Sequence, residues 1–191
     1  AVHGRYAARE MQRALHDTVG EVLRVCAAEG IEAGQAHGGT ITLARNEAQV
    51  QRLRAQLAES RRFGFGARDL RWISAPEAIE RCRATDVLGA LVTPHCAAVH
   101  PLRLLHGLAR AVQRRGVIVH DHTPAQAIRP ERVETPVGVV RSEVIVLATE
   151  AYTSRLAGRR RELLPVYSLM VATDPLSKEQ WADIGLADRA T

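Results

Sequence analysis

The chain has 191 residues, of which 46% are hydrophobic and 25% are charged, an ordinary composition for a soluble globular protein. This length predicts one medium domain or two small lobes that can bury a core without disulfide bonds. The formal net charge is +5, and arginine supplies nearly all of the positive charge because Lys178 is the only lysine. The basic residues are scattered beside acidic ones, which argues against nucleic-acid binding.

Cysteine usage and hydropathy narrow the class of protein further. Cys26, Cys82 and Cys96 have a spacing that fits neither a zinc motif nor a disulfide framework. Reduced thiols are typical of cytoplasmic proteins, and the cytoplasm is the predicted location. No segment approaches the roughly 18 apolar residues of a membrane span, and no secretion signal is visible at the start. The sequence therefore predicts no association with membranes.

The first half of the chain alternates helices and short strands. Residues 7–29 are predicted to be helical, with one apolar face at steps of three and four made by Met11, Leu15, Val19, Val22 and Cys26. The alternation in residues 39–44 predicts a half-buried strand, and Asn46 caps a second helix. Ser74 and Glu77 form a capping box for a short helix, after which residues 87–93 read as an apolar strand.

The second half begins with a helix that His100 and Pro101 open, with a predicted buried face of Leu105, Leu108 and Val112 that Leu104 and Ala111 widen. Strands are then predicted at residues 117–119, 142–148 and 163–173, and a hairpin at residues 132–140. Ser177 and Gln180 form a further capping box, and Gly185 ends that last helix. The pattern predicts two lobes built from interwoven segments.

The strand predicted at residues 142–148 ends in small residues, Ala148 and Thr149. A strand that is apolar on both faces is typical of the interior of a covered sheet. Ligands bind at the carboxyl ends of such strands, where small side chains give access to the backbone. Two interpretations fit: Ala148 contacts a ligand, or it packs beneath a helix.

Three segments together resemble the FAD-dependent D-amino-acid oxidase superfamily. They read GALVTPHCAAVHPLRLLHGLARAVQRRGVIVHDHTPAQAI, VETPVGVVRSEVIVLATEAYTSRL and LLPVYSLMVATDPLSKEQWADIG. The segment GGTITLARNEAQVQRL is similar to the start of the substrate domain in the same proteins. The likeness is strongest to the gamma-glutamylputrescine oxidase and glycine/sarcosine oxidase-like branch, and it covers nearly the whole chain.

The resemblance implies a mixed α/β fold, with part of an FAD-binding Rossmann-like domain interleaved with an antiparallel-sheet substrate domain. On this basis residues 1–86 are a helical segment and the first part of the substrate domain. Residues 87–162 are a portion of the FAD-binding domain, and residues 163–191 return to the substrate domain. The implied cofactor is FAD, and the implied cofactor-binding residues are Pro124, Ala125, Gln126, Ala148 and Thr149. The tips of these two segments are expected to form a slot for the adenosine half of FAD.

The chain departs from the family pattern at the phosphate-binding turn. The family opens with a strand, G-x-G-x-x-G and a helix, whereas here Gly64 and Gly66 match the first two glycines and Asp69 stands at the third. Glu150 also stands where the family commonly has glycine or asparagine. The chain is therefore expected to be an internal part of a longer enzyme, to bind FAD weakly by itself and to be inactive by itself.

Other polar groups carry weaker signals. His120 and His122 share one face of a predicted strand, but no third metal ligand accompanies them, so no metal site is predicted. His95, Cys96 and His100 lie in the loop that the family turns toward the flavin, where helix entry explains them at least as well as a polar contact does.

Two further groups of residues are candidate substrate contacts. Tyr167 could face the substrate or pack in its strand. Arg159 and Arg161 could attract a carboxylate or belong to a solvated turn. No catalytic residue can be assigned from the sequence.

The resemblance implies an enzyme that oxidises the C–N bond of an amine or amino acid. Hydride passes to the flavin, an imine forms and hydrolyses, and molecular oxygen is the candidate acceptor that reoxidises the flavin to give peroxide. The expected partner is a small-molecule amine or amino acid. The alternative is a non-catalytic binding or interaction module on the same scaffold. A third hypothesis, nucleic-acid binding through the arginines, predicts retention on DNA that depends steeply on salt.

Overall fold

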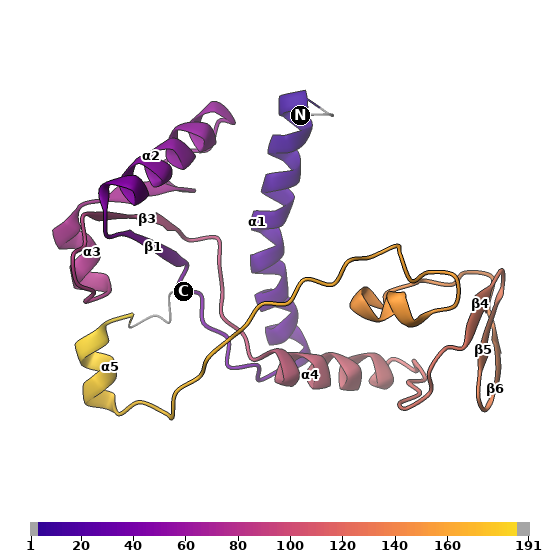
Figure 1. Ribbon diagram of the computed structural model, residues 1–191. Coiled ribbons are helices and arrows are strands. Elements are labelled where there is room, and N and C mark those ends of the chain that lie inside the picture. The colour runs from indigo at the N-terminus through magenta and orange to yellow at the C-terminus, as the bar shows by residue number, and fades with distance from the viewer. Residues whose placement is uncertain (1–3, 187–191) are drawn as a thin grey trace. The chain divides into compact units, whose positions relative to one another are not determined.

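The computed structural model describes residues 4–186 (Figure 1). The chain divides into two compact units: one comprises the chain up to Gly116 together with Asp174 onward, and the other comprises Val117–Thr173. Each unit contains one three-stranded antiparallel sheet. The mixed α/β class predicted from the sequence is confirmed. The assignment of segments to a substrate domain and an FAD-binding domain stays a prediction.

The sheet of the first unit has the order β1-β3-β2. Its strands are β1 (Thr40–Ala44), β2 (Arg71–Ile73) and β3 (Gly89–Thr93), and β3 pairs antiparallel with both neighbours. Gly39 precedes β1 with φ +72°, and a Cβ there would lie 2.3 Å from the Thr93 carbonyl oxygen. Glycine is therefore required where β1 approaches the end of β3.

Alternate residues of β3 point to opposite sides of this sheet. Apolar residues on each side are covered by a helix. On one face α2 (Glu47–Arg62) packs through Leu53 against Leu91. On the other face α3 (Ala75–Arg81) packs through Ala78 against Ala90. The predicted caps are confirmed: the Asn46 side chain accepts from the Gln49 N–H, and Ser74 and Glu77 form a capping box.

Two helices of the first unit, α1 (Gly4–Glu29) and α4 (Pro101–Arg114), meet near the end of α1 (Figure 1). Here α4 contributes Leu104 to a cluster around Cys26 and Ile31. The predicted face of α4 is confirmed only at its edge: Ala111 is buried and Leu104 packs in the cluster, whereas the predicted centre was wrong, since Leu105 is 61% exposed. Small side chains allow the closer approach of the helix to Ile31, and this favours the face that carries them.

The predicted apolar face of α1 is buried only near its C-terminal end. Met11 is 64% exposed, whereas Cys26 is fully buried. The first half of α1 instead faces Phe65 and His95 through His16. A regular apolar period therefore identified the helix and, through Val22 and Cys26, the side that packs at its C-terminal end, but not the exposure of its first half.

Ion pairs also join the end of α1 to the end of α4. The Glu29 carboxylate accepts hydrogen bonds from Arg115 at 2.8 Å and from Arg114 at 3.3 Å. The hydrogen bond from Arg115 is the main cause of the lowered pKa of Glu29; partial burial opposes it, and the charges of both arginines add to it. The carboxylate form is therefore bound more favourably in the folded protein than in the unfolded chain.

We expect these ion pairs of Glu29 to make the free energy of unfolding depend on pH in the acid range. Because the folded pKa of Glu29 lies below its unfolded value of about 4.3, the stabilisation is complete above that value and is lost as the pH falls through the folded pKa. Urea unfolding at a series of pH values from 7 to 3 measures this loss, and Glu29→Gln should reduce its slope. Glu32→Gln is the matched control, since Glu32 makes no ion pair among residues 4–186. Equal slopes for the two variants would contradict the assignment to Glu29.

The second unit contains a β-meander followed by a short 3-10 helix. Its strands are β4 (Ala127–Arg129), β5 (Arg132–Thr135) and β6 (Gly138–Arg141), which pair in that order. The hairpin predicted at residues 132–140 is thus confirmed, and β4 extends it. The 3-10 helix η1 covers Glu150–Arg155.

Three predicted strands are wrong in this part of the chain. Residues 117–119, 142–148 and 163–173 are extended or irregular and form no sheet ladder. Their apolar side chains are largely exposed, as in Val146, which is 81% accessible. A strand needs a neighbour to bind its backbone N–H and C=O groups along its length, and these three segments belong to neither sheet of the described residues.

The chain returns to the first unit through α5 (Lys178–Ile184). The capping box of Ser177 and Gln180 is confirmed, and Gly185 follows the helix with φ +88°. Gly185 forms an isolated antiparallel bridge with Cys82, just after α3. None of the helices within residues 4–186 combines the length and the hydropathy that crossing a bilayer requires.

Candidate functional site

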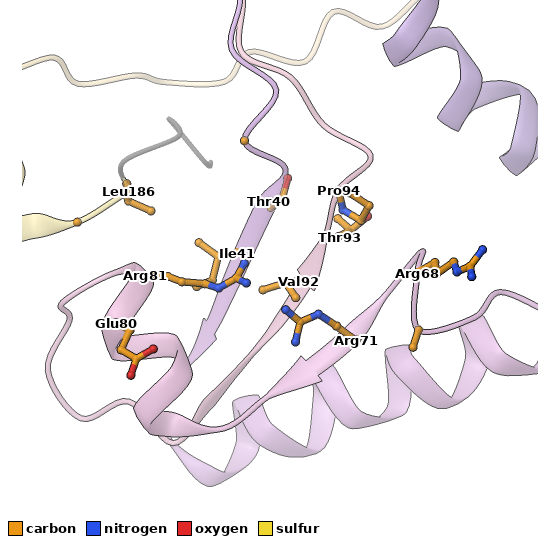
Figure 2. A pocket seen from close by; sticks show the side chains of 13 residues that line it. Thr40, Ile41, Arg68, Arg71, Glu80, Arg81, Val92, Thr93, Pro94 and Leu186 are labelled. Carbon is orange, nitrogen blue, oxygen red and sulfur yellow. The ribbon is translucent and has the colours of Figure 1, made fainter.

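A cavity of about 580 Å³ lies on the face of the first sheet that α3 covers (Figure 2). The three strands, the last turn of α3 and the segment after α5 all contribute to it. Its apolar floor is made by Ile41 of β1 and Val92 of β3, which are register partners. The other lining residues are Gly38, Thr40, Ala67, Arg68, Arg71, Glu80, Arg81, Thr93, Pro94, Gly185 and Leu186.

Two arginines reach over this floor. Arg71 of β2 is paired with Val92, so both side chains lie on the same face of the sheet. Arg81 comes from the last turn of α3. Figure 2 shows the side chains of Arg71 and Arg81 extending toward one another, whereas Arg68 and Glu80 point away. The cavity therefore has a positive centre above an apolar surface.

Neither arginine is held by a carboxylate in the part of the chain that the structure describes. Among residues 4–186, Arg71 and Arg81 take part in no ion pair. Their charges contribute to the lowered pKa of Glu77, but the larger causes are the backbone and side-chain hydrogen bonds from Ser74. Because the Glu77 carboxylate is engaged in capping α3, the two guanidinium groups remain available to an anion. A carboxylate matches the donor geometry of arginine.

The end of α5 closes one side of the cavity. The Leu186 N–H donates to the Arg81 carbonyl oxygen at 2.7 Å. A Cβ at Gly185 would lie 2.6 Å from that same oxygen, so only glycine permits this close approach. Segments about 100 residues apart in the sequence, the end of α3 and the residues after α5, thus meet at one pocket.

Sequence reasoning did not identify Arg71 or Arg81 as site residues. A signal for Arg71 was present, because alternation puts it on the same face of its strand as Ile73, which is buried in the core. A charged residue on the core face of a strand is unusual and indicates a site. No comparable signal marks Arg81, which depends on how α3 packs.

The residues predicted to bind FAD lie in the second unit. Pro124, Ala125 and Gln126 directly precede β4, and the Gln126 N–H donates to the Glu134 carbonyl oxygen at 2.8 Å. Ala148 is exposed and lies just before η1, not at the tip of a strand as predicted. Each segment forms hydrogen bonds with its own surroundings, and the slot between the two stays a prediction.

Thr149 and Glu150 have local partners. The Thr149 hydroxyl lies 2.7 Å from that of Thr153, which is buried. The Glu150 carboxylate accepts the N–H of Ala151, and Glu150 has φ +43°. The sequence contains no glycine-rich turn leading into a helix that would bind the pyrophosphate.

The structure also shows the surroundings of the weaker candidate site residues in the second unit. His120 and His122 lie in an exposed segment outside any strand, so the predicted shared strand face does not exist. Tyr167 is 84% exposed and not packed in a strand. Arg159 pairs with Glu162 at 2.9 Å, as in the solvated turn considered above.

The histidines near α4 separate into two roles. His100 caps α4, with its Nδ1 accepting the Arg103 N–H at 3.4 Å, so helix entry explains it. His95 instead contacts His16 and Asp69. This cluster was not predicted, because its members are far apart in the sequence.

Comparison with known proteins identifies the family. The model of the FAD dependent oxidoreductase family matches residues 1–190, and the chain belongs to this family. The "Probable oxidoreductase OrdL" of Haemophilus influenzae is 30% identical over 149 residues, which cover 73% of this chain and 34% of the relative. A glycine oxidase of Geobacillus kaustophilus is 29% identical over 162 residues, which cover 81% of this chain and 42% of the relative. The chain thus spans less than half the length of these curated relatives.

Solved structures agree with this membership. The crystal structure of the Geobacillus kaustophilus glycine oxidase matches with a TM-score of 0.59 at 25% identity, over 81% of this chain and 41% of that one. Glycine oxidase from Bacillus cereus has the same fold in the matched region, with a TM-score of 0.66 at 20% identity over 77% of this chain and 42% of that one. The resemblance to the D-amino-acid oxidase superfamily is confirmed, and FAD is the cofactor of the family.

Proposed function

We propose that the protein containing this chain oxidises the C–N bond of an amino acid or a related amine. Membership of the FAD dependent oxidoreductase family and similarity to a glycine oxidase support this reaction. When bound, FAD accepts a hydride from the carbon next to the substrate nitrogen. The imine that leaves the enzyme hydrolyses, and we propose oxygen as the final acceptor and the cytoplasm as the location.

The observation that carries the preference for an amino acid is the pair of arginines above the floor of the sheet. Arg71 and Arg81 extend toward one another and have no acidic partner among the described residues. A substrate carboxylate bound between them would supply that partner, while Ile41 and Val92 contact the apolar part of the substrate. The guanidinium groups thereby bind and orient the substrate but take no part in proton transfer, because arginine stays protonated.

For the cofactor, we propose that Pro124, Ala125 and Gln126 contact the adenine side and that Ala148 and Thr149 lie beside the nucleotide. Small side chains at these positions give the cofactor access to the backbone. The missing G-x-G-x-x-G turn supports a second proposal, that residues 1–191 by themselves bind FAD weakly and are inactive. Each absent charge-assisted hydrogen bond to the pyrophosphate is worth roughly 1.5–3 kcal/mol.

Two preparations test these proposals together. The protein expressed from its complete reading frame should be purified with a flavin absorption spectrum and should release peroxide in a screen of amino acids and amines. Residues 1–191 expressed by themselves should be colourless under the same conditions. A complete protein without flavin would support the alternative of a non-catalytic module, and a yellow 191-residue chain would contradict the proposal of weak binding.

A further inference from the structure

Two histidines and a carboxylate meet in the first unit, away from the arginine pair. His16 is in α1, Asp69 precedes β2, and His95 follows β3. One potential ligand atom from each residue lies within 4.8 Å of the others, and all three side chains are half-buried. Three separate segments of the chain are therefore brought together by groups that bind metal ions.

The cluster is held in a definite geometry. The rings of His16 and His95 are stacked, with centroids 3.6 Å apart and planes inclined by 7°. Nε2 of His95 lies 3.1 Å from Oδ1 of Asp69, while Oδ2 of Asp69 accepts the Gly66 N–H at 2.7 Å. The edge of the Phe65 ring packs against His16, with centroids 5.5 Å apart. The aspartate is thus fixed by the loop, with one oxygen directed to the histidines.

His16 and Asp69 favour the forms that bind a cation. The Gln12 amide nitrogen lies 2.9 Å from Nε2 of His16, and a cation bound at Nε2 would replace this contact. Burial is the main cause of the lowered pKa of His16; the neighbouring His95 lowers it further, and Asp69 and Asp17 oppose the change. Burial opposes the lowered pKa of Asp69, but the hydrogen bonds from Gly66 and His95 outweigh it. Neutral imidazole and ionised carboxylate are the forms that bind metal.

We propose that His16, Asp69 and His95 form a site for a divalent cation of the zinc class. Two imidazoles and one carboxylate are ligands that suit Zn²⁺, Co²⁺ or Fe²⁺, whereas Mg²⁺ and Ca²⁺ favour oxygen ligands. Ligand atoms around tetrahedral zinc are about 3.3 Å apart, given bonds of about 2.0 Å. Binding therefore requires the side chains to rotate, so that the stacked rings leave their parallel arrangement and the three ligand atoms, now within 4.8 Å of one another, close around the ion.

A cavity of about 410 Å³ adjoins the cluster and is lined by His16, Asp69 and Gln12 among others. It gives space for water or a small anion on the remaining coordination positions. The site has a structural consequence, because the cation connects α1 to the loops beside β2 and β3. Binding should therefore stabilise the packing of α1 on the rest of the first unit.

The test is titration of the purified, tag-free protein with Zn²⁺ by calorimetry, with Co²⁺ as a spectroscopic probe. We expect one equivalent of Zn²⁺ to bind, a rise in melting temperature, and visible Co²⁺ absorption bands from a site of nitrogen and oxygen ligands. His16→Gln, His95→Gln and Asp69→Asn should each weaken Zn²⁺ binding more than tenfold. Even mutation of a residue that only hydrogen-bonds to a metal ligand typically lowers the affinity by at least that factor. Asp69→Asn is the mildest change, because an amide can keep the hydrogen bond from Gly66.

Matched controls come from the same chain. His106→Gln and Asp121→Asn change exposed residues of the same types outside the cluster, so they should leave Zn²⁺ affinity within about twofold. Circular dichroism before titration shows which variants are folded. The proposal is overturned if the unmodified protein binds no Zn²⁺, or if folded Asp69→Asn binds as tightly as Asp121→Asn.

Discussion

Gly89→Ala should lower the free energy of unfolding of the first unit by roughly 2–4 kcal/mol. Gly89 begins the central strand β3 with φ +151°, which strains any residue that has a side chain. A Cβ there would lie 2.2 Å from Cζ2 of Trp72 and 3.0 Å from the Ile73 carbonyl oxygen. Trp72 cannot easily move aside, because the Arg54 guanidinium stacks on it 4.0 Å from the ring centroid. Urea unfolding followed by tryptophan fluorescence measures the change, since Trp72 and Trp181 both belong to the first unit.

Gly20→Ala is the matched control for this prediction. Gly20 is an exposed residue in the interior of α1, and a Cβ there meets nothing within 4 Å. The same substitution should therefore stabilise the protein by up to about 1 kcal/mol, because alanine favours the helix over glycine. If the two variants unfolded at the same urea concentration, the close packing of Trp72 over Gly89 would be incorrect.

Local signals in the sequence predicted the helices well. Capping boxes at Ser74 and Ser177 and the cap at Asn46 depend on residues three positions apart, so they are visible without knowledge of the fold. The hairpin around Gly138 was predicted for the same reason, since its turn is local.

Predictions that required a distant partner were less successful. The apolar run that includes Val144 and Val146 has the composition of an inner strand, but a strand forms only beside a neighbour. The centre of the buried side of α4 was also predicted wrongly, because close packing of Ile31 on Gly107 turned the helix toward Ala111 and Leu104 and left Leu105 exposed. Hydrophobic periodicity reports which residues can be buried, whereas the packing partner determines which are.

The candidate sites also differ in whether a local pattern in the sequence marks them or only contacts between distant segments form them. Arg71 is marked by its place on the core face of a short strand, so careful attention to alternation could have found it. The contacts of His16 with His95, and of His95 with Asp69, connect segments far apart in the sequence. No spacing rule links them, and only the folded chain brings them together.

Arg71→Ala should reduce kcat/KM for an amino-acid substrate by about a hundredfold in the flavin-loaded protein from the complete reading frame. Loss of a charge-assisted contact to a carboxylate costs roughly 1.5–3 kcal/mol, and each 1.36 kcal/mol corresponds to about a tenfold change in rate. Arg81→Ala should act in the same direction, because both guanidinium groups extend over Ile41 and Val92. The measurement is peroxide release with an N-methyl amino acid and with the corresponding amine that lacks the carboxylate. The amine should lose less than about threefold, since it has no group for the arginines to bind.

Arg68→Ala provides the control within the same cavity, because Arg68 lines it but points away from the arginine pair. Its kcat/KM with the amino acid should stay within about twofold of the unmodified protein, as expected when no direct contact is removed. An equal loss for Arg71→Ala and Arg68→Ala would mean that only the general positive potential matters. An equal loss of Arg71→Ala on the amino acid and on the amine would mean that Arg71 supports the fold of β2 and does not bind the carboxylate. The proposed site therefore requires two differences in the loss of kcat/KM. The loss must be larger for Arg71→Ala than for Arg68→Ala, and for Arg71→Ala it must be larger with the amino acid than with the amine.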